Sequence, residues 1–233
     1  KIMALKIKTG VSLKGRINLF ILQITKDFSC IMVLGGSFIN QKIIMKEPIL
    51  EPLLRKTRLK QVIPYLRKYP NCRLLDIGCG WDAKLLRAVE PFIFSGVGVD
   101  LKAPPIKTEK LIMQSLVLED KLPFDNCSFD FITMLAVIEH LENDELILKE
   151  CVRLLRPGGG LLITAPSTYA KPVLEFLSFK LNLINPFEIR DHKRYYNKKD
   201  LLALINKIDG LVFSQHSYFQ WRFNNKIFCL AKN

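Results

Sequence analysis

The 233-residue chain lacks several features that would place it in a specialised class of protein. It has no uncharged apolar run of about 18 residues, the length that a membrane-spanning helix requires. Its six cysteines form no Cys-x-x-Cys pair, and no Cys/His group has zinc-ligand spacing, so we expect no metal site. Internal repeats and low-complexity tracts are absent too. These absences favour a reduced, cytoplasmic globular protein.

Acidic residues are outnumbered, because 35 Lys and Arg stand against 22 Asp and Glu and leave a net charge of +13. The excess is greatest in residues 1–44, which hold seven basic residues and one acidic residue, Asp27. A basic surface suits nucleic acid, an anionic membrane or an acidic substrate, or it serves solubility alone. Two interpretations of residues 1–44 stay open: a non-native upstream extension preceding a natural start at Met45, or a basic arm touching a membrane.

Beyond residue 44 the pattern becomes regular. Residues 45–70 predict a helical cap with an apolar stripe that Pro64 interrupts. Residues 71–233 alternate short apolar strands with helices, which is typical of a mostly parallel sheet covered on both faces. The last two strands are separated only by a turn at Asn224-Asn225, so they should pair antiparallel. The seven predicted strands are Cys72–Ile77, Phe94–Val99, Leu111–Leu116, Phe129–Leu135, Leu161–Ala165, Leu211–Ser217 and Lys226–Leu230.

The strongest local signal ends the first predicted strand, in Leu74-Leu75-Asp76-Ile77-Gly78-Cys79-Gly80. Glycines at a strand-to-helix turn let a ligand approach the backbone, and the next helix offers free N–H donors. Asp100 ends the following strand, where a carboxylate can accept both ribose hydroxyls of an adenosine-type cofactor. These two signals leave a nicotinamide cofactor and S-adenosylmethionine open.

Asp76 favours S-adenosylmethionine. A carboxylate two residues before the first glycine repels a pyrophosphate, because like charges repel. It attracts a cofactor that carries an ammonium group and a sulfonium.

With these residues the sequence resembles the class I S-adenosylmethionine-dependent methyltransferases, above all the branch that includes ubiquinone and menaquinone biosynthesis enzymes. The resemblance covers about residues 71–166 and implies a Rossmann-like, seven-stranded, mostly parallel α/β sheet with an antiparallel C-terminal hairpin and helices on both faces. Five segments carry it in the family's order: Leu75–Gly80, Gly98–Asp100, Leu122–Asp130, Ile138–Leu141 and Leu154–Gly159.

The resemblance also implies site residues. It makes Pro157-Gly158-Gly159 a structural turn before the fifth strand. Where the family often has a third glycine this chain has Asp82, which we expect to cap the next helix. Nine residues are assigned to the cofactor: Asp76, Gly78, Cys79 and Gly80 to its methionine moiety, Asp100 and Leu101 to its ribose, Val117 and Leu118 to its adenine, and Leu135 to its sulfonium side.

Two histidines are candidate catalytic bases for a hydroxyl acceptor. His140 follows the fourth strand in Ile138-Glu139-His140-Leu141, and His192 lies in a His-x-Arg-Tyr stretch that many relatives share. The alternative is that both are structural, His140 satisfied by its neighbours at a helix start and His192 packed in a loop.

Residues 171–197 form an apolar insertion. Apolar side chains lie on nearly every face of a possible helix in 172–187, and such a helix is usually buried. We interpret it as core packing, as a dimer contact, or as a lid over a lipophilic acceptor such as a quinone, an isoprenoid or a lipid-linked sugar.

The predicted function is methyl transfer to a small-molecule acceptor by in-line displacement, with peripheral membrane contact left open. A nucleic-acid partner is not expected. Base-modifying relatives typically have Asn/Asp-Pro-Pro-aromatic where this chain has Thr133-Met134-Leu135-Ala136. The alternatives are a NAD(P)-dependent Rossmann oxidoreductase and a non-catalytic methyltransferase-like binding protein.

Overall fold

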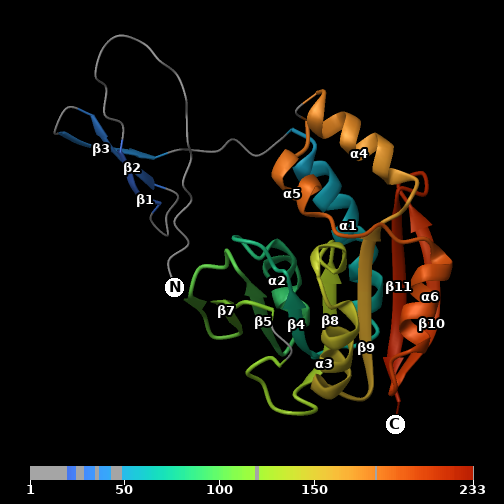
Figure 1. Cartoon of the computed structure of the whole chain (residues 1–233). Coiled ribbons are helices and arrows are strands. Elements are labelled where there is room, and N and C mark those ends of the chain that lie inside the picture. Colours follow the sequence, from blue (N-terminus) through green and yellow to red (C-terminus); the bar gives the residue numbers. More distant parts are fainter. Residues whose placement is uncertain are drawn as a thin grey trace. The chain divides into compact units, whose positions relative to one another are not determined.

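The computed structural model describes residues 20–24, 29–34, 37–42, 49–118, 121–181 and 183–232. The chain divides into two compact units, 1–47 and 48–233 (Figure 1). In the first unit, β1 (Phe20–Ile24), β2 (Ser29–Leu34) and β3 (Ser37–Lys42) form an antiparallel sheet. Met45 and most of residues 1–44 lie outside the described ranges, so both interpretations of that segment stay predictions.

The second unit is built on an eight-stranded sheet of order β10-β11-β9-β8-β4-β5-β7-β6. Neighbours from β9 to β7 pair in parallel, whereas β10, β11 and the edge strand β6 pair antiparallel. The predicted fold class is therefore confirmed, with the two-residue β6 as an additional strand. The strands are β4 (Arg73–Ile77), β5 (Ser95–Asp100), β6 (Ile106–Lys107), β7 (Leu111–Ser115), β8 (Phe129–Leu135), β9 (Leu155–Pro166), β10 (Leu211–Phe219) and β11 (Asn224–Ala231).

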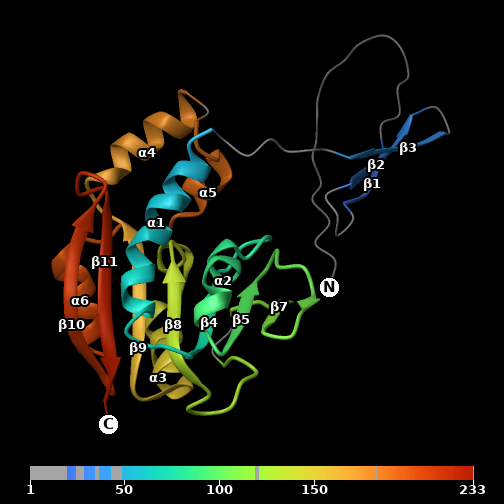
Figure 2. The same cartoon turned by 180° about the vertical axis from the view of Figure 1, so that it is seen from behind.

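Side-chain alternation along the strands divides the core into two layers. Leu75 and Ile132 pack with α3 (Asp144–Leu154) and α6 (Lys198–Asn206) on one face of the sheet. Their neighbours Leu74 and Phe131 pack with α1 (Glu51–Leu66) and α2 (Lys84–Val89) on the other. Figures 1 and 2 show these two helical layers from opposite sides. Every helix within the described ranges is too short or too polar to traverse a lipid bilayer.

Three local predictions are wrong. Pro64 does not break α1, since it lies in the last turn, where a missing N–H deprives only the carbonyl of Lys60 of its partner. The segment 157–159 is part of β9, which begins at Leu155.

The third error concerns the last hairpin. Asn224 and Asn225 are the first residues of β11 and pair with Phe219 and Tyr218. The turn lies just before them, at 220–223, and its first three residues all have positive φ. This turn is closed by the N–H of Phe223, which donates to the Gln220 carbonyl. Positive φ is rare outside glycine and asparagine, so the sequence offered no signal for the true turn.

Candidate functional site

The site lies at the point where the order of the parallel strands reverses. β4 lies between β5 and β8, with β7 added beyond β5 and β9 beyond β8. In open α/β sheets, ligands bind outside the carboxyl ends of the strands at such a switch point. Asp76 of β4 and Thr133 of β8 are direct neighbours in register, and Thr133 Oγ1 donates to Asp76 Oδ1 at 2.7 Å. Thr133 thus holds the carboxylate at the switch point, a role that strand periodicity alone does not reveal.

Asp76 is an unfavourable place for a negative charge. Its side chain is 3% exposed. Burial raises its pKa to about 7, Thr133's hydrogen bond opposes this, and the charge of Asp100 adds to it. A positively charged ligand would stabilise the ionised form, whereas an anionic one would oppose it.

The loop after β4 brings its backbone to the same edge. The N–H of Gly78 donates to the Val99 carbonyl at 2.8 Å, which ties the loop to β5. Gly78 and Gly80 have φ of +75° and +72°, a region that side chains disfavour. A Cβ at Gly78 would lie 2.1 Å from Val137 Cγ2, whereas one at Gly80 would meet no atom of the described chain within 4 Å. Gly78 is therefore required for packing, and Gly80 borders open space.

Hydrogen bonds fix the carboxylate of Asp100 beside the open space at Gly80. Its Oδ2 accepts from the N–H of Gly80 at 3.0 Å, and its Oδ1 accepts from the N–H of Lys102 at 2.7 Å. The loop after β4 and the end of β5 are thereby joined through one carboxylate. The prediction that Asp100 lies next to the glycine loop agrees with this geometry, while its contact with ribose stays a prediction.

The other assigned cofactor residues differ in accessibility. Leu101 and Val117 are exposed at 66% and 57%, and Leu118 and Leu135 are half-buried. The side chain of Cys79 is buried over Gly98, so only its backbone faces the loop surface.

Asp82 does not cap α2. The helix starts later than predicted, at Lys84 with Ala83 as its N-cap, and Asp82 instead pairs with Lys84 at 3.2 Å.

The two candidate bases lie together, although they are far apart in the sequence. His140 ends the short helix η2 (Ile138–His140) after β8, and His192 follows α5 (Pro186–Asp191). Their ring centroids are 4.8 Å apart in an edge-to-face arrangement. His140 Nδ1 lies 3.0 Å from Asp191 Oδ2, within hydrogen-bonding distance. The N–H of Lys193 donates to the Glu139 carbonyl at 2.7 Å and so ties the loop after α5 to η2.

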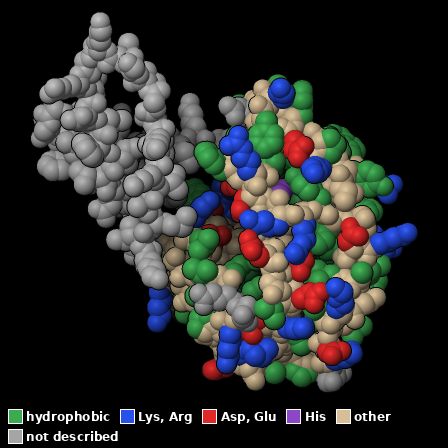
Figure 3. Space-filling view, in the orientation of Figure 1, with side chains coloured by type: hydrophobic (Ala, Val, Ile, Leu, Met, Phe, Trp, Pro, Cys, Tyr) green, Lys and Arg blue, Asp and Glu red, His purple; other side chains and the backbone are tan. Residues whose placement is uncertain are grey.

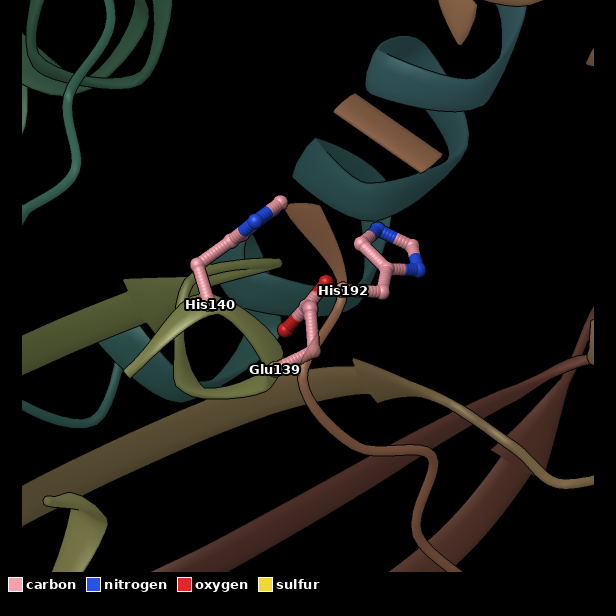
Figure 4. Close-up of side chains that lie close together, drawn as sticks. All are labelled: Glu139, His140 and His192. Atoms are coloured by element: carbon pink, nitrogen blue, oxygen red, sulfur yellow. The ribbon is translucent and has the colours of Figure 1, made fainter. Parts of the chain in front are cut away.

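Glu139 completes this group, and sequence reasoning assigned it no role. Its side chain is 1% exposed, and its Oε2 has no hydrogen-bond partner within the described part of the chain. Burial raises its pKa to about 8, although its backbone hydrogen bond and Arg58 of α1 oppose the shift. Burial also lowers the pKa of His192 to about 4, with His140 contributing. Figure 4 shows the three side chains gathered at one place beside α1.

The apolar insertion is not a buried helix. It forms α4 (Ala170–Phe179) and α5, and only Ala170 and Ser178 of α4 are buried. Phe176 is 55% exposed and Phe187 73% exposed. Hydrophobic side chains are visible on the surface at the end of the unit where α4 and α5 lie (Figure 3). Core packing is therefore the wrong interpretation, while a lid and a dimer contact both stay predictions.

A cavity of about 550 Å³ is lined by residues of this insertion, including His192. Its wall combines apolar and cationic side chains with a tyrosine, Tyr195, whose hydroxyl is buried without a partner in the described structure. The cavity is adjacent to the histidine pair and large enough for a small molecule. Among its lining residues are Lys171, Phe179, Ile189, Arg190, His192, Lys193 and Tyr195.

Known proteins resemble the chain around this site. The family described as "Methyltransferase domain" matches residues 75–163. The "Ubiquinone biosynthesis O-methyltransferase" of Idiomarina loihiensis is 25% identical over 160 residues, covering 61% of this chain and 65% of that protein. The protein of the same name from Maricaulis maris is 35% identical over 105 residues, 40% of each chain. Over residues 75–163 the chain carries a methyltransferase domain, and its likeness is to the class I S-adenosylmethionine-dependent methyltransferases. The chain spans less than two thirds of the length of both relatives.

Solved structures show the same fold. The YcgJ protein from Bacillus subtilis has a TM-score of 0.55 and 18% identity, covering 76% of this chain and 99% of that chain. An S-adenosylmethionine-dependent methyltransferase from Mesorhizobium loti has a TM-score of 0.54 and 14% identity, covering 72% and 97%. The predicted likeness to S-adenosylmethionine-dependent methyltransferases is confirmed by the family match and the curated relatives, and S-adenosylmethionine is the cofactor that it implies.

Proposed function

We propose that this protein binds S-adenosylmethionine at the β4–β8 switch point and transfers its methyl group to a hydroxyl of a small acceptor. The observation that carries the proposal is the pair of carboxylates, Asp76 and Asp100, on neighbouring strands with the glycine loop between them. The family match to residues 75–163 supports it. The same carboxylates disfavour an anionic dinucleotide, because Asp76 would face its pyrophosphate.

The residues present fit this cofactor. When bound, S-adenosylmethionine supplies a methyl group on a positively charged sulfur. Asp76 is buried and accepts its described side-chain hydrogen bond from a neutral hydroxyl, so it offers the negative charge that such a molecule needs. Open space borders Gly80, where a Cβ would meet nothing of the described chain. Asp100 uses one acceptor site on each oxygen for backbone N–H groups, which leaves further lone pairs for two hydroxyls.

The acceptor has to lose a proton if its methylated atom is a hydroxyl oxygen. Asp191 orients the ring of His140 through Nδ1, so Nε2 is the nitrogen left to face an acceptor. His192 is neutral at physiological pH, since its pKa is about 4. General-base assistance of this kind contributes roughly 10²–10⁴-fold to a rate.

The cavity indicates the acceptor class. Phe179 and Ile189 offer apolar surface. Four cationic residues of the wall outnumber its one acidic residue, Glu175; they are Lys171, Arg190, Lys193 and Arg194. These walls suit a molecule with an apolar body and an acidic group. The relatives named ubiquinone biosynthesis O-methyltransferases support an O-methylated, lipophilic acceptor. Phe179 of α4 lines the cavity and is 45% exposed, so it is suited to close over such a molecule.

Calorimetric titration tests the cofactor assignment. We expect S-adenosylmethionine to bind the full chain and NAD to give no heat of association. Asp100→Asn should raise the dissociation constant at least tenfold, because an amide accepts fewer hydroxyl hydrogen bonds than a carboxylate. Asp209→Asn is the matched control and should leave it unchanged, since Asp209 lies in the turn before β10. Uptake of NAD, or equal affinity in both variants, would refute the proposal.

A further inference from the structure

We propose that Glu139, His140 and His192 form a binding site for one zinc ion. Three ligand atoms, a carboxylate oxygen and one nitrogen from each ring, all lie within 4.8 Å of one another. They come from η2 and from the residue after α5, two segments held together by the backbone bond from Lys193 to Glu139. Figure 4 shows the carboxylate of Glu139 between the two rings.

The polar atoms of this cluster need a partner. Glu139 Oε2 and His192 Nδ1 are both buried, and neither has a hydrogen-bond partner in the described ranges. A buried polar atom left without a partner costs about 1–3 kcal/mol, and more for a charged group. The carboxylate of Glu139 belongs to the cluster, so an ion bound by the three side chains would satisfy this buried group.

His140 has the support that metal-binding histidines usually have. Its Nδ1 is within 3.0 Å of Asp191 Oδ2, which fixes the ring and leaves Nε2 for the ion. Asp191 also forms an exposed ion pair with Lys193, with 3.7 Å between Oδ1 and Nζ. Asp191 is therefore a positioning residue of the proposed site.

Two imidazole nitrogens and one carboxylate are the ligand types of a catalytic zinc site with an open fourth position. Magnesium and calcium prefer oxygen ligands and are disfavoured by this set. The ligands of a tetrahedral zinc ion lie about 3.3 Å apart at ordinary bond lengths. The 4.8 Å span therefore has to contract when the ion binds, and side-chain rotation at His192, which is partly exposed, can bring this about.

The suggested role of the ion rests on the proposed function, with zinc in place of His140 as the group that activates the acceptor. His192 lines the 550 Å³ cavity, so the open coordination position would be next to an acceptor. An acceptor hydroxyl bound there loses its proton to water as its O–H bond breaks, and its oxygen stays bound as an anion. Zinc binding itself does not depend on that role.

The test is zinc titration of the chelator-treated full chain by calorimetry, with Cys127→Ser in every background to remove the exposed thiol. We expect one ion per chain. His192→Ala and His140→Ala should each weaken zinc binding at least tenfold. His216→Ala is the matched control, because the third histidine of the chain is on β10 and contacts Asn225. That variant should keep the parent affinity.

Cobalt provides a second measurement. Cobalt-loaded parent chain should show the intense visible absorption of four-coordinate cobalt, and His192→Ala should lose it while keeping its far-UV circular dichroism. Absence of zinc binding in the parent, or unchanged affinity and spectrum in both histidine variants, would overturn the inference. S-adenosylmethionine titration of the same zinc-free samples keeps the two proposals distinct. Cofactor binding without zinc binding refutes only the metal site, and the reverse refutes only the cofactor assignment.

Discussion

Replacing Asp76 by asparagine should make the protein more stable and less able to bind its cofactor. Burial raises the pKa of Asp76 from 3.8 to about 7. The unfolded chain therefore releases this proton at lower pH than the folded chain does, and the folded state loses stability as pH rises between these values. The difference corresponds to about 4 kcal/mol, present in full only above pH 7. Asparagine removes the ionisation, and its side-chain oxygen still accepts from Thr133.

The pH dependence makes the effect measurable. Between pH 5 and pH 8, the free energy of unfolding of the Asp76→Asn variant should gain about 2–3 kcal/mol relative to the parent. For a chain of this size that corresponds to roughly 5–10 °C in melting temperature. Glu139 titrates in the same region, but it is present in both proteins and cancels from the difference. Thermal unfolding of both proteins at several pH values gives the comparison.

Cofactor affinity should change in the opposite direction. The variant lacks the negative charge, so its dissociation constant for S-adenosylmethionine should rise at least tenfold at pH 8, as measured by calorimetry. A stability difference that is constant from pH 5 to pH 8 would refute the assignment of a buried, destabilising carboxylate. Unchanged affinity would separately refute its contact with the cofactor's charge.

Three further substitutions test the glycine loop and a buried ion pair. Gly78→Ala should destabilise the fold by about 2–5 kcal/mol, because the new Cβ would meet Val137 and φ at this position is positive. Gly80→Ala should cost only the backbone strain of about 1–2 kcal/mol, since its Cβ would meet no atom of the described chain. Equal losses of the two variants in urea denaturation would contradict the close approach of Val137 to Gly78. Glu150→Gln should cost about 2–3 kcal/mol, since Glu150 is 5% exposed and Arg153 Nε donates to it at 2.8 Å. Loss of stability on acidification should also be smaller in that variant, because the pKa of Glu150 is lowered in the folded chain.

Local sequence patterns predicted most of the sheet. Runs of apolar residues ended by glycine or aspartate identified β4, β5 and β8 closely, and β8 matched residue for residue. The missing helix between the last two strands correctly implied an antiparallel hairpin. Strand β6 escaped detection because two residues carry no periodicity. The accessibility of α4 could not be read from its composition, since the same apolar residues suit a buried helix and an exposed binding surface.

The sequence predicted those site residues that lie close together along the chain. The glycine loop and Asp100 were accessible to spacing rules because they lie on consecutive strands. Thr133, Glu139 and Asp191 were missed, since their roles depend on partners from other segments. The one signal available for Thr133 was its place on a strand adjacent to β4, and it required knowledge of the register. No spacing rule joins Glu139 and His140 to His192.

Two buried carboxylates at one edge of the sheet lower the stability of the folded chain. Asp76 and Glu139 are almost completely buried, and burial raises the pKa of each into the range of 7 to 8. Within the described ranges, Asp76 accepts from the Thr133 hydroxyl and Glu139 Oε2 accepts from no donor, whereas Glu150 is paired with Arg153. Stability alone would favour neutral residues at both positions, so their charge points to cations that come from outside the chain. A sulfonium beside Asp76 and a metal ion beside Glu139 would stabilise them separately, and binding of each should raise the melting temperature additively.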